Sequence, residues 1–234
     1  MTELAFRDDA YLRACPGIVT RAEGREVELD RTVFYPTGGG QPGDSGRLVL
    51  ADGQAVAVAD AIKGASGGVI HLLAEGATAP AVGTKVSAEI DWDRRYRLMR
   101  MHTCLHLLSA VLPYPVTGGQ VGDGKGRLDF DIPEATLDKD RIGAKLNELV
   151  AANHSVAARW IEDAELAAKP ELVKTMSVKP PTGQGKVRLI EVAGLDLQPC
   201  GGTHVRLTSE IGKVAVTKIE KKGRLNRRVM VAFA

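Results

Sequence analysis

The chain has 234 residues, of which 44% are apolar, enough for one large or two small hydrophobic cores. It has no window of eighteen consecutive apolar residues and no basic-then-apolar N-terminal segment, which excludes a membrane partner and a secretory signal. The three cysteines are an odd number and favour a reducing, cytoplasmic location over a disulfide scaffold. The formal net charge of +2 excludes little, because a nucleic-acid binder can carry its positive charge locally.

Residues 1 to 90 contain short β-prone runs separated by turn signals such as Gly53, Gly76 and Gly83. The runs are Glu26–Leu29, Thr32–Tyr35, Arg47–Leu50, Ala55–Ala59, Val69–Leu73 and Lys85–Ile90. Strands at this spacing predict a small β-barrel. Within one run His71 alternates with Ile70 and Leu72, which predicts an exposed strand residue rather than a metal ligand.

The second part, residues 91 to 234, combines helices with strands. Asp91 can cap a helix from Trp92 to about Leu112, where prolines follow. Two more helices are predicted, one from about Asp138 to Asn153 and a short one that Asp163 caps. Residues 169–185 predict a loop.

Strands are predicted at Lys186–Val192, Lys213–Glu220 and Arg227–Phe233. The overall prediction is therefore an α+β protein. A small N-terminal β-barrel (residues 1–90) precedes an α+β domain (residues 91–234) with helices packed on one side of an antiparallel sheet.

Two glycine-rich segments nearly repeat, Thr37–Asp44 and Thr117–Asp123. Glycines let the backbone approach a ligand closely, and a glutamine amide both donates and accepts hydrogen bonds. The segments therefore predict either two loops that frame a pocket or two simple tight turns. A phosphate loop is rejected at Gly119–Lys125, because Gly126 stands where magnesium binding needs Ser or Thr.

Two ligand-spaced pairs predict a metal site. His102 and His106 lie four apart on the predicted helix, so both imidazoles point the same way. Far downstream, Cys200 and His204 form the second pair, and two glycines between them allow a tight loop. The chain has five histidines and three cysteines, so half of these residues fall into the two pairs. Together they make the His3Cys set that zinc prefers.

These residues carry a family resemblance. The stretch His102–Leu108, followed about ninety residues later by Cys200–His204, resembles the zinc site of the alanyl-tRNA synthetase editing domain and of its free-standing relatives, the AlaX proteins. Further matching segments are Phe34–Asp44, Thr117–Gln120 with Arg127–Phe130, and Ile219–Gly223 before Asn226–Arg228.

The resemblance implies hydrolysis of an aminoacyl ester. The expected partner is the acceptor end of tRNA(Ala) carrying a wrong amino acid, chiefly serine, and the expected cofactor is Zn²⁺. Gln120 is the candidate polar group of the amino-acid pocket, with Thr103 and Thr117 as further catalytic candidates. Leu105 replaces a Thr that many synthetase editing domains carry, so we expect serine to be sensed elsewhere.

Substrate contacts are predicted on two features. The loop containing Gly39, Gly40 and Gln41 can frame the pocket. Basic clusters that include Arg100 and Lys222 can track phosphates, although each cluster can instead be a solvated face.

Two other functions remain open at this stage. One is a zinc-stabilised tRNA-binding module without catalysis, because four protein ligands can close a structural zinc site. The other is a metallohydrolase for a small ester. A zincin protease is rejected, because Thr103 stands where the general base Glu would follow the first histidine.

Overall fold

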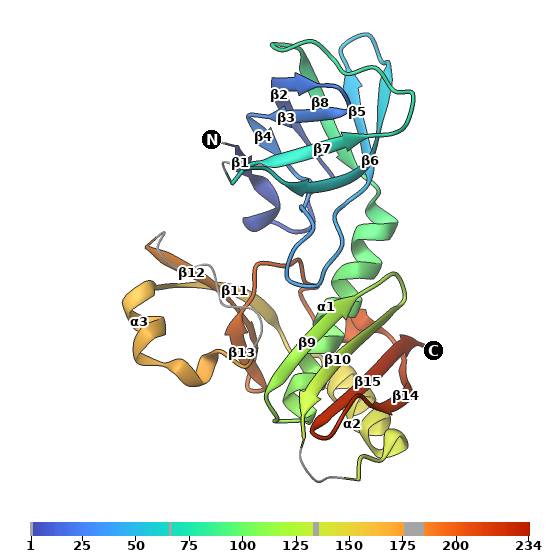
Figure 1. The fold of residues 1–234 in the computed structure, drawn as a ribbon, viewed down its shortest axis with the longest axis vertical. Helices are drawn as coiled ribbons and strands as arrows, with labels where there is room; N and C mark the ends of the chain where they lie inside the picture. The colour runs from blue at the N-terminus through green and yellow to red at the C-terminus, as the bar shows by residue number, and fades with distance from the viewer. Residues whose placement is uncertain (1, 66, 133–135, 176–184) are drawn as a thin grey trace. The chain divides into compact units, whose positions relative to one another are not determined.

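The structure is a computed structural model that describes residues 2–65, 67–132, 136–175 and 185–234. The chain forms two compact units, Met1–Arg97 and Leu98–Ala234 (Figure 1). The division falls within helix α1, Trp92–Val111. The Asp91 cap is confirmed, since its carboxylate accepts a hydrogen bond from the Arg94 N–H at 3.1 Å. In the part of the chain that the structure describes, no helix combines the length and apolar character needed to span a bilayer.

The first unit is the small barrel that the sequence predicts. Its six strands close antiparallel in the order β2 (Ala14–Glu23), β3 (Glu26–Leu29), β7 (Val69–Leu73), β6 (Ala55–Lys63), β5 (Gly46–Leu50) and β8 (Lys85–Ile90). A parallel pair, β1 (Glu3–Leu4) and β4 (Arg31–Thr32), lies outside the closed sheet. The predicted run Thr32–Tyr35 is therefore strand only at its start. Strand β2 was not predicted, because Pro16 and Gly17 look like turn signals in the sequence.

His71 is wholly buried, so the prediction of an exposed strand residue is wrong. In β7 the side chains of Val69, His71 and Leu73 point into the barrel, and those of Ile70 and Leu72 point to the opposite face. A shift of one residue moves a strand's whole pattern to the other face. The imidazole is accommodated because Nδ1 donates to the Val27 carbonyl at 3.0 Å and Nε2 accepts from the Thr32 hydroxyl at 2.8 Å.

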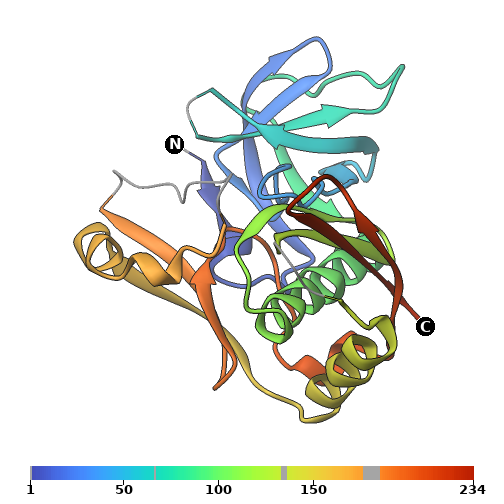
Figure 2. The same cartoon turned by 60° about the horizontal axis from the view of Figure 1, so that its bottom comes forward.

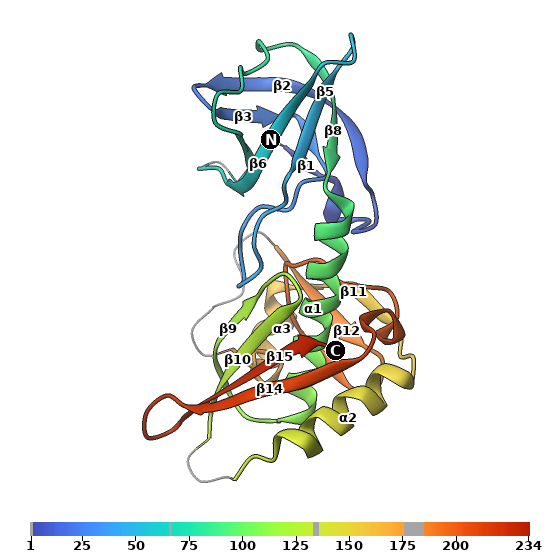
Figure 3. The same cartoon turned by 90° about the vertical axis from the view of Figure 1, so that its right-hand side faces the viewer.

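The second unit contains a four-stranded antiparallel sheet in the order β14 (Val214–Lys221), β15 (Asn226–Phe233), β10 (Lys125–Asp131) and β9 (Val116–Val121). Val216, Val231 and Gly126 are cross-strand neighbours and share one face. Met101 of α1 packs against Gly126, and α2 (Lys139–Ala151) packs against Val216. Both helices therefore cover the same face, as predicted (Figures 2 and 3).

The segment Thr117–Gln120 lies in strand β9 and is neither a loop nor a turn. Gly118 and Gly119 pair with Asp129 and Leu128 of β10. A Cβ at Gly119 would lie 2.9 Å from the Leu128 side chain. Glycine at this position thus reflects close packing within a sheet.

A second sheet has the order β11 (Val156–Glu162), β12 (Lys186–Val192) and β13 (Asp196–Pro199). One face packs on helix α3 (Asp163–Ala168) through Val187, Leu189 and Leu166. The cap of α3 is Glu162 rather than the predicted Asp163, whose carboxylate accepts from the Gly185 N–H. Short 3₁₀ turns occur at Ala5–Arg7, Pro170–Leu172 and Thr208–Ile211. Most of the predicted loop, residues 176–184, lies outside the described residues.

Candidate metal centre

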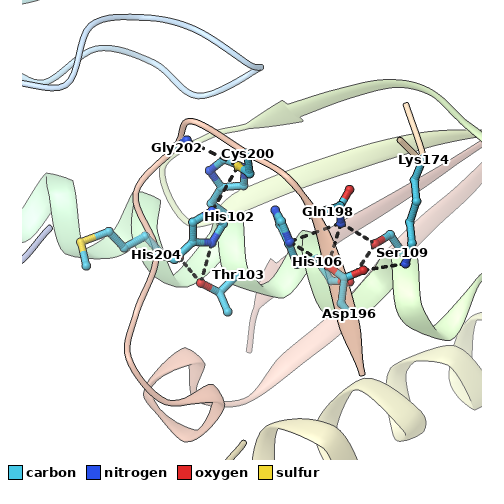
Figure 4. Close-up of polar contacts among 11 residues, drawn as sticks. His102, Thr103, His106, Ser109, Lys174, Asp196, Gln198, Cys200, Gly202 and His204 are labelled. Atoms are coloured by element: carbon cyan, nitrogen blue, oxygen red, sulfur yellow. Dashed lines mark hydrogen bonds and ion pairs between the residues drawn. The ribbon is translucent and has the colours of Figure 1, made fainter. Parts of the chain in front are cut away.

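The structure brings the four predicted ligands together. His102 and His106 lie one turn apart on α1, while Cys200 and His204 lie in the loop that follows β13. Their ligand atoms all lie within 4.8 Å of one another. Figure 4 shows the loop folded back over α1, so that residues about a hundred positions apart in the sequence share one centre.

The donor set fits a zinc ion. In a tetrahedral zinc site the zinc–sulfur bond is about 2.3 Å long and the zinc–nitrogen bond about 2.05 Å. A sulfur ligand and a nitrogen ligand are then about 3.6 Å apart. The Cys200 Sγ atom lies 3.5 Å from His102 Nε2 and 3.3 Å from His204 Nε2. Three imidazoles and one thiol at this spacing can therefore hold one metal ion.

The surroundings of Cys200 and His204 favour the protonation states that bind a metal. Burial alone would raise the pKa of Cys200, but its interactions with His102 and His204 hold it well below its ordinary value. Burial and the neighbouring His102 lower the pKa of His204 well below its ordinary value. A thiolate and a neutral imidazole are the ligand forms that zinc requires.

His106 is held by a carboxylate that the sequence analysis missed. Nδ1 of His106 donates to Asp196 at 2.9 Å, and the same carboxylate receives Lys174 Nζ at 2.6 Å and Gln198 Nε2 at 2.8 Å. Burial alone would lower the pKa of His106, but its hydrogen bonds to Asp196 and Cys200 raise it to about 9. Burial would raise the pKa of Asp196, yet the His106 contact lowers it to about 2. The His106–Asp196 pair is therefore ionic, and binding of a metal through Nε2 of His106 would require loss of the Nε2 proton.

His204 is held by Thr103, one of the predicted catalytic residues. The Thr103 hydroxyl is fully buried and lies 3.1 Å from His204 Nδ1 (Figure 4). It also donates to the Met99 carbonyl at 3.0 Å and lies 3.3 Å from the Val205 N–H. The Thr103 hydroxyl is thus hydrogen-bonded to protein groups on the buried side of the cluster.

The cluster is most accessible at its loop. Each of the three histidines is at most 7% exposed, whereas Cys200 is partly exposed and Gly201 is exposed. A Cβ at Gly201 would meet no atom within 4 Å, so space remains beside the ligand loop. Arg188 of β12 supports this loop by donating to the Cys200 and Gly202 carbonyls at 2.8 and 2.9 Å.

Gln120 and Thr117 have hydrogen-bond partners outside the cluster. Gln120 accepts from Arg127 Nε at 3.3 Å, on the face of the sheet opposite to Gly126 and α1. The Thr117 hydroxyl donates to the Asp129 carbonyl and accepts from Asn226. Their catalytic roles stay predictions.

The basic residues of the predicted phosphate clusters differ in their surroundings. Arg95, which belongs to the same basic stretch as Arg100, is wholly buried and thus unavailable to a phosphate. Arg100 donates from Nε and Nη2 to the Ile211 carbonyl and lies 4.2 Å from the Phe233 ring centre. Lys222 is exposed next to Glu220, at 3.1 Å. Of these three, Lys222 has the exposed side chain, with its charge paired to Glu220.

The glycine-rich loop belongs to the first unit. Gly39 and Gly40 have positive φ angles of 56° and 81°, a backbone region that favours glycine. Gly38 and Gln41 close the turn with paired backbone hydrogen bonds, and Tyr35 donates to the Gly38 carbonyl. The loop is therefore a tight turn, and its contact with substrate stays a prediction.

The two remaining cysteines, Cys15 and Cys104, are buried. Burial raises the pKa of Cys104 to about 12. Although Cys104 lies between the two histidines of α1 in the sequence, its side chain belongs to the core and not to the cluster.

Two family models match the chain. Residues 15–94 match the model described as tRNA synthetases class II (A). Residues 187–230 match the model described as the threonyl and alanyl tRNA synthetase second additional domain, and this segment contains Cys200 and His204.

Curated relatives match almost the whole chain. The alanyl-tRNA editing protein AlaX-M of Saccharolobus solfataricus is 35% identical over 98% of this chain and 98% of its own length. The protein of the same name from Methanosarcina mazei is 37% identical over 98% of this chain and 95% of its own length. The alanine–tRNA ligase of Metallosphaera sedula is 35% identical over 94% of this chain, but the match covers only 25% of the ligase.

Proposed function

The chain belongs to the family of alanyl-tRNA editing proteins, and from this premise we propose that it hydrolyses the ester of mischarged tRNA(Ala), chiefly seryl-tRNA(Ala). The observation that carries the proposal is the buried cluster of three imidazoles and one thiol. The names of the full-length relatives support editing as the activity and tRNA as the partner. The choice of serine and the acceptor end as target is our inference.

The cluster suits an ester that is already activated. Such a reaction needs the acyl end held in place, a water oriented and charge on the carbonyl oxygen stabilised. We propose that His102, His106, Cys200 and His204 hold Zn²⁺, which supplies positive charge for anchoring the substrate end or polarising the carbonyl or the water. The loop at Cys200 and Gly201 is the side on which the acyl end is accommodated, because Cys200 is partly exposed there and space remains beside Gly201.

The remaining polar groups are of two kinds: those that contact the cluster histidines, and those that lie elsewhere in the unit. Asp196 and Thr103 act on the histidines from inside the unit. Gln120 belongs to the sheet face that α1 does not cover, and Thr117 is hydrogen-bonded to Asp129 and Asn226, so we assign no chemical step to them. Selection of serine over alanine requires a group that pairs with the serine hydroxyl, because alanine would leave that group unpaired.

The experiment is release of serine from seryl-tRNA(Ala), measured beside release of alanine from alanyl-tRNA(Ala). It compares intact protein with His106→Ala and with His154→Ala, a histidine outside the cluster, and zinc content is measured in all three. We expect serine-selective release that His106→Ala loses and His154→Ala keeps. Absence of release by zinc-loaded intact protein would refute the proposal.

The two alternatives give different results in the same assay. A zinc-stabilised tRNA-binding module binds tRNA but releases no amino acid. A small-ester hydrolase works without tRNA and is insensitive to salt, whereas phosphate contacts make tRNA affinity fall steeply as salt rises.

A further inference from the structure

The cluster contains two residues that touch its histidines from behind, one from each ligand-bearing segment. Asp196 begins β13, four residues before Cys200, and contacts His106 of α1. Thr103 lies on α1, directly after His102, and contacts His204 of the loop. We propose that Asp196 and Thr103 are reciprocal positioning residues, each of which orients a histidine of the opposite ligand pair so that its Nε2 atom faces the metal.

The contact with Asp196 determines which nitrogen of His106 carries the proton. An ionised carboxylate only accepts hydrogen bonds, so Nδ1 of His106 must be the donor. Gln198 Nε2 lies 3.2 Å from the same ring nitrogen, but both are donors and converge on one oxygen of Asp196. The lone pair that remains for a metal is therefore on Nε2.

Asp196 is itself fixed on three sides. Lys174 Nζ reaches its second oxygen at 2.6 Å, and Gln198 also contacts the Ser109 hydroxyl of α1 at 3.1 Å. Asp196 as a whole is 5% exposed, and its side chain is fully buried. Such a network restricts the carboxylate to one orientation, and through it the imidazole ring.

The same argument applies to Thr103 and His204. A hydroxyl has one proton, and that of Thr103 goes to the Met99 carbonyl at 3.0 Å. Towards His204 the oxygen therefore accepts, and Nδ1 is the donor. The other nitrogen, Nε2, lies 3.3 Å from Cys200 Sγ, on the metal side of the ring.

The arrangement links metal affinity to the packing of α1 against β13. Thr103 of α1 supports His204 of the loop, and Asp196 of β13 supports His106 of the helix. This assignment gives Thr103 a role other than the catalytic one that the sequence suggests. It rests on the proposed metal binding and not on the substrate.

The test is the zinc dissociation constant of the full chain, measured by competition with a chromophoric chelator. The variants are Asp196→Asn, Thr103→Ala and Thr103→Ser. The matched controls are Asp140→Asn on α2 and Thr217→Ala on β14, which change the same residue types at exposed positions. Visible absorption of the Co²⁺-substituted protein reports the geometry of the ligands, and thermal unfolding reports folding.

We expect Asp196→Asn and Thr103→Ala each to weaken zinc binding about 10- to 100-fold and to alter the cobalt spectrum. Thr103→Ser keeps the hydroxyl and should remain within about threefold of the intact protein, as should both controls. If Asp196→Asn does not fold, Lys174→Met takes its place. This variant removes one partner of the same carboxylate, so we expect a smaller loss of zinc affinity.

Zinc affinities unchanged within twofold in Asp196→Asn and Thr103→Ala would overturn the proposal. Normal zinc affinity with lost deacylation in Thr103→Ala would instead make its hydroxyl catalytic. Failure of the intact protein to deacylate any tRNA would refute the proposed function but leave the affinity measurements, and hence this inference, standing or falling separately.

Discussion

Arg95 and Asp44 form an ion pair that is almost completely removed from solvent. Nε of Arg95 donates to one carboxylate oxygen at 2.9 Å, and Nη2 contacts the other. The guanidinium also donates to the Ala10 and Val33 carbonyls at 3.0 and 2.6 Å. Asp44 receives in addition the backbone N–H of Tyr35 at 2.6 Å. One residue near the start of α1 thus holds three segments of the first unit.

Removing one partner of this pair should be strongly destabilising. Asp44→Ala leaves the Arg95 charge buried without its counterion, and we expect a loss of about 3–5 kcal/mol in the free energy of unfolding. The control is Glu89→Ala, which breaks an ion pair with the exposed Arg47 and should cost at most about 1 kcal/mol. Urea unfolding, followed by tryptophan fluorescence, measures both losses. Equal losses in the two variants would contradict the prediction.

His71 should make the stability of the chain depend on pH. Burial, the largest influence, lowers its pKa from 6.5 to about 4 in the folded protein. The unfolded chain therefore binds a proton first as the pH falls. Stability is fully present above pH 6.5 and is lost towards pH 4, by about 3 kcal/mol in total.

Urea unfolding at several pH values, at saturating zinc, checks this expectation. His71→Gln retains a donor and an acceptor but cannot titrate, so its free energy of unfolding should fall less steeply on acidification than that of the intact protein. His154→Gln serves as the control for removal of an imidazole elsewhere. Parallel curves for intact protein and His71→Gln would show that this histidine is not protonated on unfolding.

Zinc should stabilise the folded chain through the cluster. Binding to the folded form alone adds about 4 kcal/mol at a free concentration a thousandfold above the dissociation constant. Thermal unfolding should shift upwards with zinc and return on addition of a chelator. His106→Ala should lose the shift, whereas His154→Ala should keep it. A shift of equal size in both variants would place zinc elsewhere.

The basic hairpin between β14 and β15 should contribute to tRNA binding. Between residues 213 and 228 the sole acidic residue is Glu220. Lys221→Ala and Lys222→Ala should each weaken binding and reduce the slope of log affinity against log salt by about one. Lys145→Ala on α2 is the control. Unchanged slopes in both hairpin variants would remove this surface from the tRNA contact.

Some features of the chain could be predicted because they depend on local spacing. A helix brings residues four apart to one side, which explains why His102 and His106 were recognised as a pair. Regular strands with few glycines or prolines, such as Lys186–Val192, also agree with the structure. By contrast, the glycines of Thr117–Gln120 suggest a loop or a tight turn, whereas the segment is a strand in which Gly119 packs closely against Leu128.

The sequence by itself determined which four residues form the candidate metal cluster, and the α+β fold with its small barrel. Only the tertiary structure decided which groups hold those ligands. Asp196 becomes a partner of His106 because β13 turns its side chain towards α1, and Thr103 becomes a support because the loop returns His204 to it. His71 shows the same limit, since its burial depends on which face of β7 the barrel encloses. Local periodicity defines the faces of an element, but long-range packing selects what each face meets.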